Sequence, residues 1–246
     1  MTEFNIKDLR KSYIVNNRPL DVLKGVNLEL MSKGITVIVG KSGCGKTTLL
    51  RILAGLEQPG GGEMSKQLNC KKGMVFQEAR LMPWLNTIDN ITFGLKKGKY
   101  DEKSITSLVK SVGLNGFEKA YPNQLSGGMQ QRAALARALA FNPEIILMDE
   151  PFAALDYFTR AAMQSELIRI CKESGKAVVF VTHSLEEAII LGQKIVVLNE
   201  GIVKATYDLS GYPYPRDIMS TELIQIKKEL LEQLDFALPE ERRNVS

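Results

Sequence analysis

The sequence predicts an α/β fold with a mostly parallel central sheet, an N-terminal antiparallel β-subdomain and a helical subdomain. Apolar runs at 35–39, 145–148 and 177–182 are typical of strands that are buried on both faces. Each run is followed by polar or glycine-rich residues and then by a helical pattern. Strands that alternate with helices in this order favour a parallel sheet.

The remaining elements are predicted from residue spacing. Residues 4–30 indicate short strands, and a turn at 199–201 joins two further strands, 195–198 and 202–205, in a hairpin. Three helices are predicted from apolar residues at helical spacing, namely Ile105, Leu108, Val109 and Val112; Met163, Leu167, Ile170 and Cys171; and Leu223, Ile226, Leu230 and Leu234. We expect the last helix to pack on the body of the protein rather than on a partner.

A chain of 246 residues is long enough for one large α/β domain, and we expect a single domain over 1–246. Its core and β-subdomain would take residues 1–77 and 141–210. The helical subdomain would take about 78–140, and a helical tail would follow over about 217–246.

Composition excludes several classes of protein. Apolar residues make up 44% and charged residues 24% of the chain, which are ordinary globular values. A formal net charge of +4 is too small to indicate nucleic-acid binding. Three cysteines favour a reducing cytoplasm over a disulfide framework, and no apolar run approaches the ~18 residues of a membrane span. We therefore expect any membrane attachment to go through partner proteins.

Residues 40–47, Gly-Lys-Ser-Gly-Cys-Gly-Lys-Thr, match the phosphate-binding pattern G-x-x-x-x-G-K-[ST] without mismatch. A buried strand precedes this loop, and a helix predicted over 47–54 follows it. In such a loop the backbone N–H groups cradle phosphates, the lysine (Lys46) reaches the β- and γ-phosphates, and the hydroxyl of Thr47 binds Mg²⁺. A glycine-rich turn without a ligand is the alternative, and the complete order of strand, loop and helix argues against it.

Asp149 and Glu150 follow the strand 145–148, at the end of a strand where α/β sheets place ligands. On an extended chain successive side chains point to opposite faces, so these two carboxylates should have different roles. Asp149 would hold the metal, and Glu150 would polarise the attacking water. The alternative is an ordinary acidic strand end before Pro151.

His183 is the single histidine of the chain. It follows the strand 177–182 and precedes Ser184 and Glu187, which have the spacing of a helix capping box. His183 would lie on the same sheet edge as Asp149. A structural role is the alternative, but this position favours a contact with a γ-phosphate.

Ser126, Gly127 and Gly128 form a turn before a helix predicted over 129–141. The glycines let backbone N–H groups approach a ligand, and a helix N-terminus carries about half a positive charge, so this turn is a second anion site. The residues alone leave two interpretations open: two separate ligands, or one ligand held between two copies of the chain.

The motifs have the order and spacing found in the nucleotide-binding subunits of ATP-binding cassette (ABC) transporters, and over residues 4–206 the chain resembles that family of P-loop NTPases. The matching motifs are Walker A at 40–47, the Q-loop at Gln77, the signature motif at 125–130, Walker B at 145–149 with Glu150 as the catalytic carboxylate, the D-loop at 154–156, the switch histidine at His183, and the adenine-stacking aromatic at Tyr13.

The resemblance implies a site for ATP and Mg²⁺. Catalytic roles would fall to Lys46, Gln77, Glu150 and His183, and metal ligation to Thr47, Gln77 and Asp149. The nucleotide contacts would come from Tyr13, Gly40, Lys41, Ser42, Gly43, Cys44, Gly45, Lys46, Thr47, Thr48, Ser126, Gly127, Gly128, Gln130 and Asp156.

In this family the signature motif of one subunit faces the Walker A loop of another, and this chain has one of each and no internal repeat. The resemblance therefore implies a homodimer, or a dimer with a related subunit, with composite ATP sites, bound to integral membrane permease subunits on the cytoplasmic face of a membrane. An extracytoplasmic substrate-binding protein would be an indirect partner, and no nucleic acid is expected.

Four stretches, 81–91, 121–124, 149–156 and 212–217, are similar to the importer ATPases for nitrate, sulfonate, taurine and related small organic compounds. Trp84 would either contact the permease or belong to the core. Two other functions are weaker alternatives: a non-transport ABC ATPase that acts on nucleic acid or ribosomes, and a regulatory module that binds nucleotide without hydrolysis. The presence of both Glu150 and His183 argues against the second of these.

Overall fold

The structure, a computed structural model, describes residues 4–96 and 100–234. The chain divides into two compact units. The first holds the described residues up to 69 and from 179 onward, and the second holds those between 70 and 178. The part of the predicted helical tail beyond 234 lies outside the described residues, and the predicted subdomain boundaries stay a prediction.

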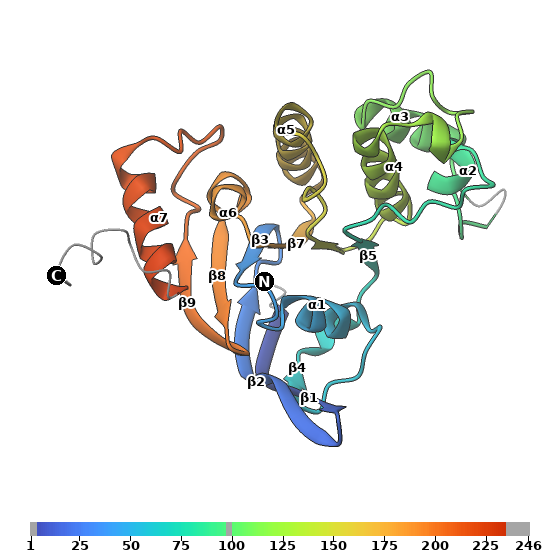
Figure 1. Ribbon diagram of the computed structural model, residues 1–246. Helices are drawn as coiled ribbons and strands as arrows, with labels where there is room; N and C mark the ends of the chain where they lie inside the picture. Colours follow the sequence, from blue (N-terminus) through green and yellow to red (C-terminus); the bar gives the residue numbers. More distant parts are fainter. Residues whose placement is uncertain (1–3, 97–99, 235–246) are drawn as a thin grey trace. The chain divides into compact units, whose positions relative to one another are not determined.

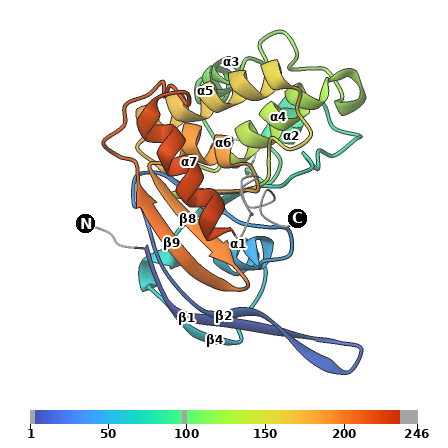
Figure 2. The same cartoon turned by 60° about the vertical axis from the view of Figure 1, so that its left-hand side comes forward.

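An antiparallel sheet in the first unit has the strand order β2-β1-β4 (Figure 2). Strands β1 (Phe4–Val15) and β2 (Arg18–Leu30) form a long hairpin, and β4 (Gly61–Met64) pairs with the other edge of β1. The expectation of short strands was wrong, because the two hairpin strands have 12 and 13 residues. Register shifts between Ile6 and Ser12 explain the difference: bulges interrupt the alternation of the sequence without ending the strand.

The first unit also contains mostly parallel strands in the order β7-β3-β8-β9. These are β3 (Gly34–Val39), β7 (Ala177–Thr182, of which residues 179–182 belong to this unit), β8 (Lys194–Asn199) and β9 (Ile202–Asp208). Strand β8 is parallel to β3 and antiparallel to β9. The predicted hairpin turn is confirmed, with positive φ angles of 49° at Glu200 and 81° at Gly201.

The described part of the first unit has three α-helices, α1 (Lys46–Ala54), α6 (Leu185–Leu191) and α7 (Thr221–Gln233), and a short 3₁₀ helix at Lys66–Asn69. Helix α7 buries Leu223 and Leu230, contacts α6, and crosses β8 and β9 in the view of Figure 2. The pKa of Tyr207 on β9 is raised by burial and by the α7 carboxylates Glu229 and Glu232. The prediction that this helix packs on the body is therefore confirmed.

Arg216 ties the segment between β9 and α7 to the end of α6. Its guanidinium donates hydrogen bonds to the carbonyl oxygens of Ile189 (2.6 Å), Gly192 (2.5 Å) and Leu209 (2.9 Å). Burial lowers the pKa of Arg216. This clamp gives a structural role to the 212–217 stretch, because carbonyl groups at a helix end need donors from elsewhere.

The second unit pairs β5 (Lys72–Val75) with β6 (Ile145–Asp149) in parallel. Its helices are α2 (Thr87–Ile91), α3 (Glu102–Ser111), α4 (Gly127–Ala140) and α5 (Tyr157–Ser174), and α4 contacts the other three and β5 (Figure 1). The predicted apolar face of α5 is buried, and that of α3 is buried except at Leu108, which is half-buried. Parallel strands, an antiparallel sheet and covering helices confirm the predicted fold class.

Candidate functional site

The loop 40–47 joins β3 to α1 in the first unit, and close packing of its glycines fixes its path. A Cβ atom added at Gly40 would lie 2.1 Å from the carbonyl oxygen of Leu198 and 2.6 Å from Sγ of Cys44. Gly45 has a φ of 105°, and a Cβ there would lie 2.8 Å from a methyl group of Leu23. These positions therefore admit no side chain, so the loop backbone can lie directly against β2 and β8.

Lys46 lies at the centre of this loop, with 5% of its surface exposed. Its Nζ donates hydrogen bonds to the carbonyl oxygens of Gly40 (2.8 Å) and Lys41 (2.9 Å). Ser42 and Gly43 are exposed, whereas Thr47 and Thr48 are half-buried in the first turn of α1. The arrangement fits a bound polyphosphate, because an ammonium group and the N–H groups of a helix N-terminus meet in one loop.

His183 is exposed directly after β7, while the backbone around it is firmly held. Ser184 Oγ accepts a hydrogen bond from the N–H of Glu187, as the capping box predicts. The reciprocal bond was wrongly predicted: the Glu187 carboxylate accepts instead from the hydroxyl of Thr182 at 2.5 Å, and the N–H of Ser184 donates to that hydroxyl at 3.0 Å. The Thr182 hydroxyl thus bridges the Glu187 carboxylate and the N–H of Ser184, which holds the chain on both sides of His183.

Tyr13 lies on β1 in the same unit and is half-buried. Its hydroxyl donates a hydrogen bond of 2.5 Å to Oε1 of Glu57. The first unit therefore holds the predicted phosphate loop, the aromatic residue and the histidine.

Gln77 and the pair Asp149 and Glu150 lie at the carboxyl ends of neighbouring parallel strands in the second unit. Val75 on β5 pairs with Met148 on β6, so Gln77 and Glu150 each follow two residues later. Glu150 has a φ of 44°, in the left-handed region that costs energy for any residue with a Cβ. Such a conformation persists at a site only where the surrounding structure holds it.

Gln131 supplies part of that support, and the sequence analysis missed it. This residue of α4 is 4% exposed. Its side-chain nitrogen donates to the carbonyl oxygens of Phe76 (3.0 Å), Gln77 (3.4 Å) and Pro151 (2.7 Å). One carboxamide thereby joins the Q-loop to the residue after Glu150. The only local signal was a polar residue on a helix rich in apolar side chains.

Arg137, one and a half turns further along α4, makes a second attachment to the Q-loop. Its guanidinium donates to the carbonyl oxygens of Ala79 and Arg80, both at 2.8 Å. Burial lowers its pKa. Both donors therefore hold the backbone of the Q-loop from the side of α4.

The turn before α4 is exposed at Ser126 and Gly127. The helix begins at Gly127, earlier than predicted, because the Ser126 hydroxyl caps it by accepting from the N–H of Met129 at 3.3 Å. A Cβ at Gly128 would lie 2.4 Å from Cγ2 of Thr159, so the turn packs on the first turn of α5.

Two other residues that were predicted to contact the nucleotide, Gln130 and Asp156, make hydrogen bonds within this region. The side chain of Gln130 donates to the carbonyl oxygens of Pro122 (2.9 Å) and Leu125 (3.2 Å). Asp156 caps α5 by accepting from the N–H of Thr159 at 3.0 Å, and hydrogen bonding with Thr159 lowers its pKa. Their polar groups stabilise the turn itself, and a nucleotide contact from either residue stays a prediction.

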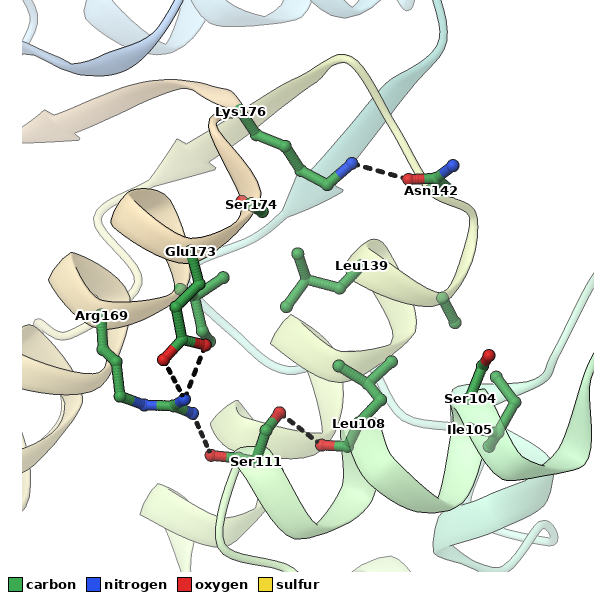
Figure 3. Close-up of a pocket in the computed structure, with 12 residues that line it drawn as sticks. Ser104, Ile105, Leu108, Ser111, Leu139, Asn142, Arg169, Glu173, Ser174 and Lys176 are labelled. Carbon is green, nitrogen blue, oxygen red and sulfur yellow. Dashed lines mark hydrogen bonds and ion pairs between the residues drawn. The ribbon is translucent and has the colours of Figure 1, made fainter.

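A pocket of about 530 Å³ between α3, α4 and α5 contains none of the predicted site residues (Figure 3). Arg169 donates to the Glu173 carboxylate at 2.8 Å and to the carbonyl oxygen of Ser111 at 3.1 Å. Lys176 donates to Asn142 Oδ1 and to the carbonyl oxygen of Pro143, both at 2.7 Å. The cations that line this pocket are therefore already engaged with carboxylate, amide and carbonyl oxygens.

Trp84 is 70% exposed, so the alternative that it belongs to the core is wrong. In the same unit a groove of about 490 Å³ is lined by Phe76, Arg80, Met82, Phe93 and Arg137 among others, and Trp84 follows Met82 two residues later in the chain. Phe93 is also exposed. The groove therefore includes Phe76, the residue that precedes Gln77, and presents both aromatic and cationic groups.

Sequence comparison places these motifs in a known family. A family model described as ABC transporter matches residues 23–153. The chain is 44% identical over 241 residues to an uncharacterised ABC transporter ATP-binding protein of Methanocaldococcus jannaschii, covering 93% of this chain and 90% of that protein. It is 42% identical over 213 residues to the aliphatic sulfonates import ATP-binding protein SsuB 1 of Shouchella clausii, covering 87% and 85%.

Solved structures agree. An ATP-binding cassette captured as a dimer after hydrolysis, with ADP and phosphate bound, has a TM-score of 0.74 at 34% identity, covering 84% of this chain and 98% of that one. The likeness to cbiO1 of Clostridium perfringens, with a TM-score of 0.76 over 96% of each chain at 22% identity, concerns the fold alone. The chain therefore belongs to the ABC transporter family and is an ATPase of that family.

Proposed function

We propose that this chain is the ATP-hydrolysing subunit of an importer for a sulfonate or a related small organic compound such as taurine, or for nitrate. The observation that carries the ATPase part is the completeness of the motifs. The first unit holds a glycine-packed loop around Lys46, and the second holds Gln77 and Glu150 at adjoining strand ends. The part that concerns cargo is supported by the names of SsuB relatives that align over most of this chain.

In the proposed reaction Lys46 and the N–H groups of the loop bind the β- and γ-phosphates of ATP, and Tyr13 stacks on adenine. Glu150 orients and polarises the attacking water. His183 donates a hydrogen bond to the γ-phosphate, for which its exposed ring on a fixed backbone is suited. Stabilisation of charge on the phosphate oxygens is the largest contribution to this class of reaction.

The residues also fit Mg²⁺. Thr47, Asp149 and Gln77 offer hydroxyl, carboxylate and amide oxygens, the donors that this ion prefers. Among the described residues there is no group of three or more metal-binding His, Cys, Asp or Glu side chains. The oxygens of Thr47, Asp149 and Gln77 match an ion that is held by a few protein oxygens together with substrate phosphates, where it would neutralise charge on the phosphates.

We assign the turn 126–128 to the ATP bound by a second copy of the chain. Ser126 and Gly127 are exposed at a helix N-terminus, and the turn packs on Thr159 and is held by hydrogen bonds from Gln130. A solved cassette that is 34% identical to this chain is a dimer. In such composite sites the binding of ATP would close the two copies on each other. Hydrolysis and product release would then let them separate.

The permease would bind at the groove beside Trp84. Among the described residues no helix has the length and apolar character needed to cross a membrane. Relatives of this chain are named as import ATP-binding proteins, so we expect an integral membrane partner. The exposed aromatic rings of Trp84 and Phe93 are typical of protein interfaces. This arrangement would hold the chain on the cytoplasmic face of the membrane, with a substrate-binding protein on the opposite side.

The experiment is affinity purification of the tagged chain from its own membranes, followed by reconstitution of the captured complex in vesicles. We expect an integral membrane protein to co-purify, and ATPase activity to rise when a sulfonate and its binding protein are supplied. A Trp84→Ala variant should keep the ATPase activity of the isolated chain but lose the membrane partner. Capture of ribosomes or nucleic acid in place of a membrane protein would refute the transport function.

A further inference from the structure

Two side chains, Glu57 and Lys11, hold or flank the ring of Tyr13. The Tyr13 hydroxyl donates to Oε1 of Glu57 at 2.5 Å, and Lys11 Nζ lies 3.3 Å from the same oxygen. Lys11 Nζ also donates to the carbonyl oxygen of Gln58 at 2.8 Å and lies 5.3 Å from the centre of the Tyr13 ring. The ring is thus held at its hydroxyl and flanked by a cation, although it is only half-buried.

The hairpin that carries Tyr13 is the one that packs on the phosphate loop. Tyr13 on β1 lies opposite Leu20 on β2, and Val22 follows two residues later, about 7 Å along the strand. The carbonyl oxygen of Val22 is 3.0 Å from the position that a Cβ on Gly45 would take. Tyr13 therefore lies within the reach of a nucleotide whose phosphates occupy the loop.

Glu57 lies just after the C-terminal end of α1, the helix whose N-terminal turn belongs to the phosphate loop. Helix α1 ends at Gly55, and the chain then runs against β1, where the N–H of Gly60 donates to the carbonyl oxygen of Arg10 at 2.7 Å. The hairpin is thus attached to α1 before its first turn and after its last. A side chain from this second attachment can fix a ring on the hairpin relative to the loop.

We propose that Glu57 is a positioning residue that holds the Tyr13 ring in place for the adenine base. This inference rests on the proposed function, in which Tyr13 stacks on adenine. A tyrosine on a strand surface has several rotamers, and fixing one of them before the nucleotide arrives removes an entropy cost from binding. The pKa of Glu57 is lowered, chiefly by the hydrogen bond from Tyr13, so the acceptor is charged at neutral pH.

The test compares the binding of ATP with the binding of inorganic tripolyphosphate, which has no base. Glu57→Ala should raise KM for ATP roughly three- to tenfold and leave kcat unchanged, because the lost stacking acts on binding alone. The affinity for tripolyphosphate should not change. Tyr13→Phe should have the same effect, and the double variant should be no worse than either single one, since both changes remove the same bond.

Two further variants separate positioning from general damage. Glu57→Gln should stay within about twofold of wild type, because its amide oxygen still accepts from the Tyr13 hydroxyl. Glu63→Ala, an exposed glutamate on β4 of the same sheet, should change nothing.

A loss of ATP affinity in Tyr13→Ala but not in Glu57→Ala would overturn the positioning role and leave the proposed function intact. Equal losses of ATP and tripolyphosphate binding in Glu57→Ala would show that Glu57 supports the loop itself, which also overturns the inference. A Lys46→Ala variant that bound ATP normally would contradict the proposed function instead.

Discussion

The two regions that carry the motifs are fixed by different kinds of interaction. In the first unit the loop 40–47 is fixed by its own backbone, through glycines that lie against Leu198 and Leu23. In the second unit the segments around Gln77 and Glu150 are fixed by side chains of α4, chiefly the carboxamide of Gln131. Damage to the first region should therefore reduce nucleotide binding, whereas damage to the second should reduce turnover.

The difference also shows why α4 matters for the second region. This helix begins at the signature turn and reaches the Q-loop through Gln131 and Arg137. A displacement at its N-terminus would act on the same hydrogen bonds that hold the Q-loop and the residue after Glu150. In the first unit steric packing of the glycines is the main constraint on the loop, and the one helix side chain that adds to it is Lys46, which belongs to the loop itself.

The largest expected effects come from one substitution in each region, one of which should reduce turnover and the other ATP binding. Glu150→Gln should lower kcat at least ~100-fold, because a general base contributes that much, and should leave ATP affinity unchanged. Lys46→Ala should do the opposite and abolish ATP binding. Steady-state turnover and equilibrium binding measure the two effects, and wild-type turnover in Glu150→Gln would remove that carboxylate from the reaction.

The next effect tests the backbone packing. Gly40→Ala places a methyl group 2.1 Å from the carbonyl oxygen of Leu198, so the loop must move. Overpacking of this kind costs about 1–3 kcal/mol of stability, and we expect ATP affinity to fall with it. Gly211→Ala, where a Cβ would meet nothing within 4 Å, is the control. Urea unfolding and ATP titration would contradict the account if both variants behaved alike.

The third prediction concerns the side-chain support. Gln131→Met keeps the volume but removes the donor to Phe76, Gln77 and Pro151, so kcat should fall about tenfold while the Kd for ATP stays the same. Gln164→Met, at another buried glutamine in the same unit, controls for a general loss of stability. A change in Kd without a change in kcat would reverse the comparison.

A smaller effect is expected at Arg137. Arg137→Lys can donate to only one of the two carbonyl oxygens of Ala79 and Arg80 with good geometry, so kcat should fall only about two- to fivefold. Binding of the permease should weaken in parallel, because Arg137 also lines the groove beside Trp84. A pull-down with the membrane partner would detect this, and a fall larger than that of Gln131→Met would show that the order of the two supports is wrong.

The last prediction is that the buried thiol of Cys171 does not react with an alkylating reagent. Burial raises the pKa of the Cys171 thiol to about 12, and the thiolate is the reactive form, so Cys171 should resist iodoacetamide at pH 8 in the folded protein. Peptide mass spectrometry before and after addition of urea measures its labelling. Equal labelling in both conditions would mean that α5 is not packed as described.

The sequence was sufficient for features that depend on neighbours in the chain. The loop 40–47 and the strand ends at Asp149 and His183 could be read from local order, because each combines a short motif with an adjacent strand or helix. The hairpin turn at Glu200 follows from the same kind of signal.

Contacts between distant segments could not be predicted. Gln131 meets residues 54 and 55 positions earlier, and Tyr13 meets Glu57 44 positions later. Such partners are chosen by tertiary packing, which leaves no periodicity in the sequence. The bridge through Thr182 and the bulges that lengthen β1 were missed for the same reason, since a hydroxyl or an extra residue changes the pairing without changing the pattern.

The central claim is that the signature turn serves the ATP of a second copy. The most direct measurement is ATP affinity and ATP-driven dimerisation of Ser126→Arg in a Glu150→Gln background, with Ser126→Ala as the control for loss of the helix cap. We expect Ser126→Arg to bind ATP as a monomer with a Kd near that of its parent and not to dimerise, while Ser126→Ala still dimerises. Loss of ATP binding by the monomer, or normal dimerisation of Ser126→Arg, would contradict the claim.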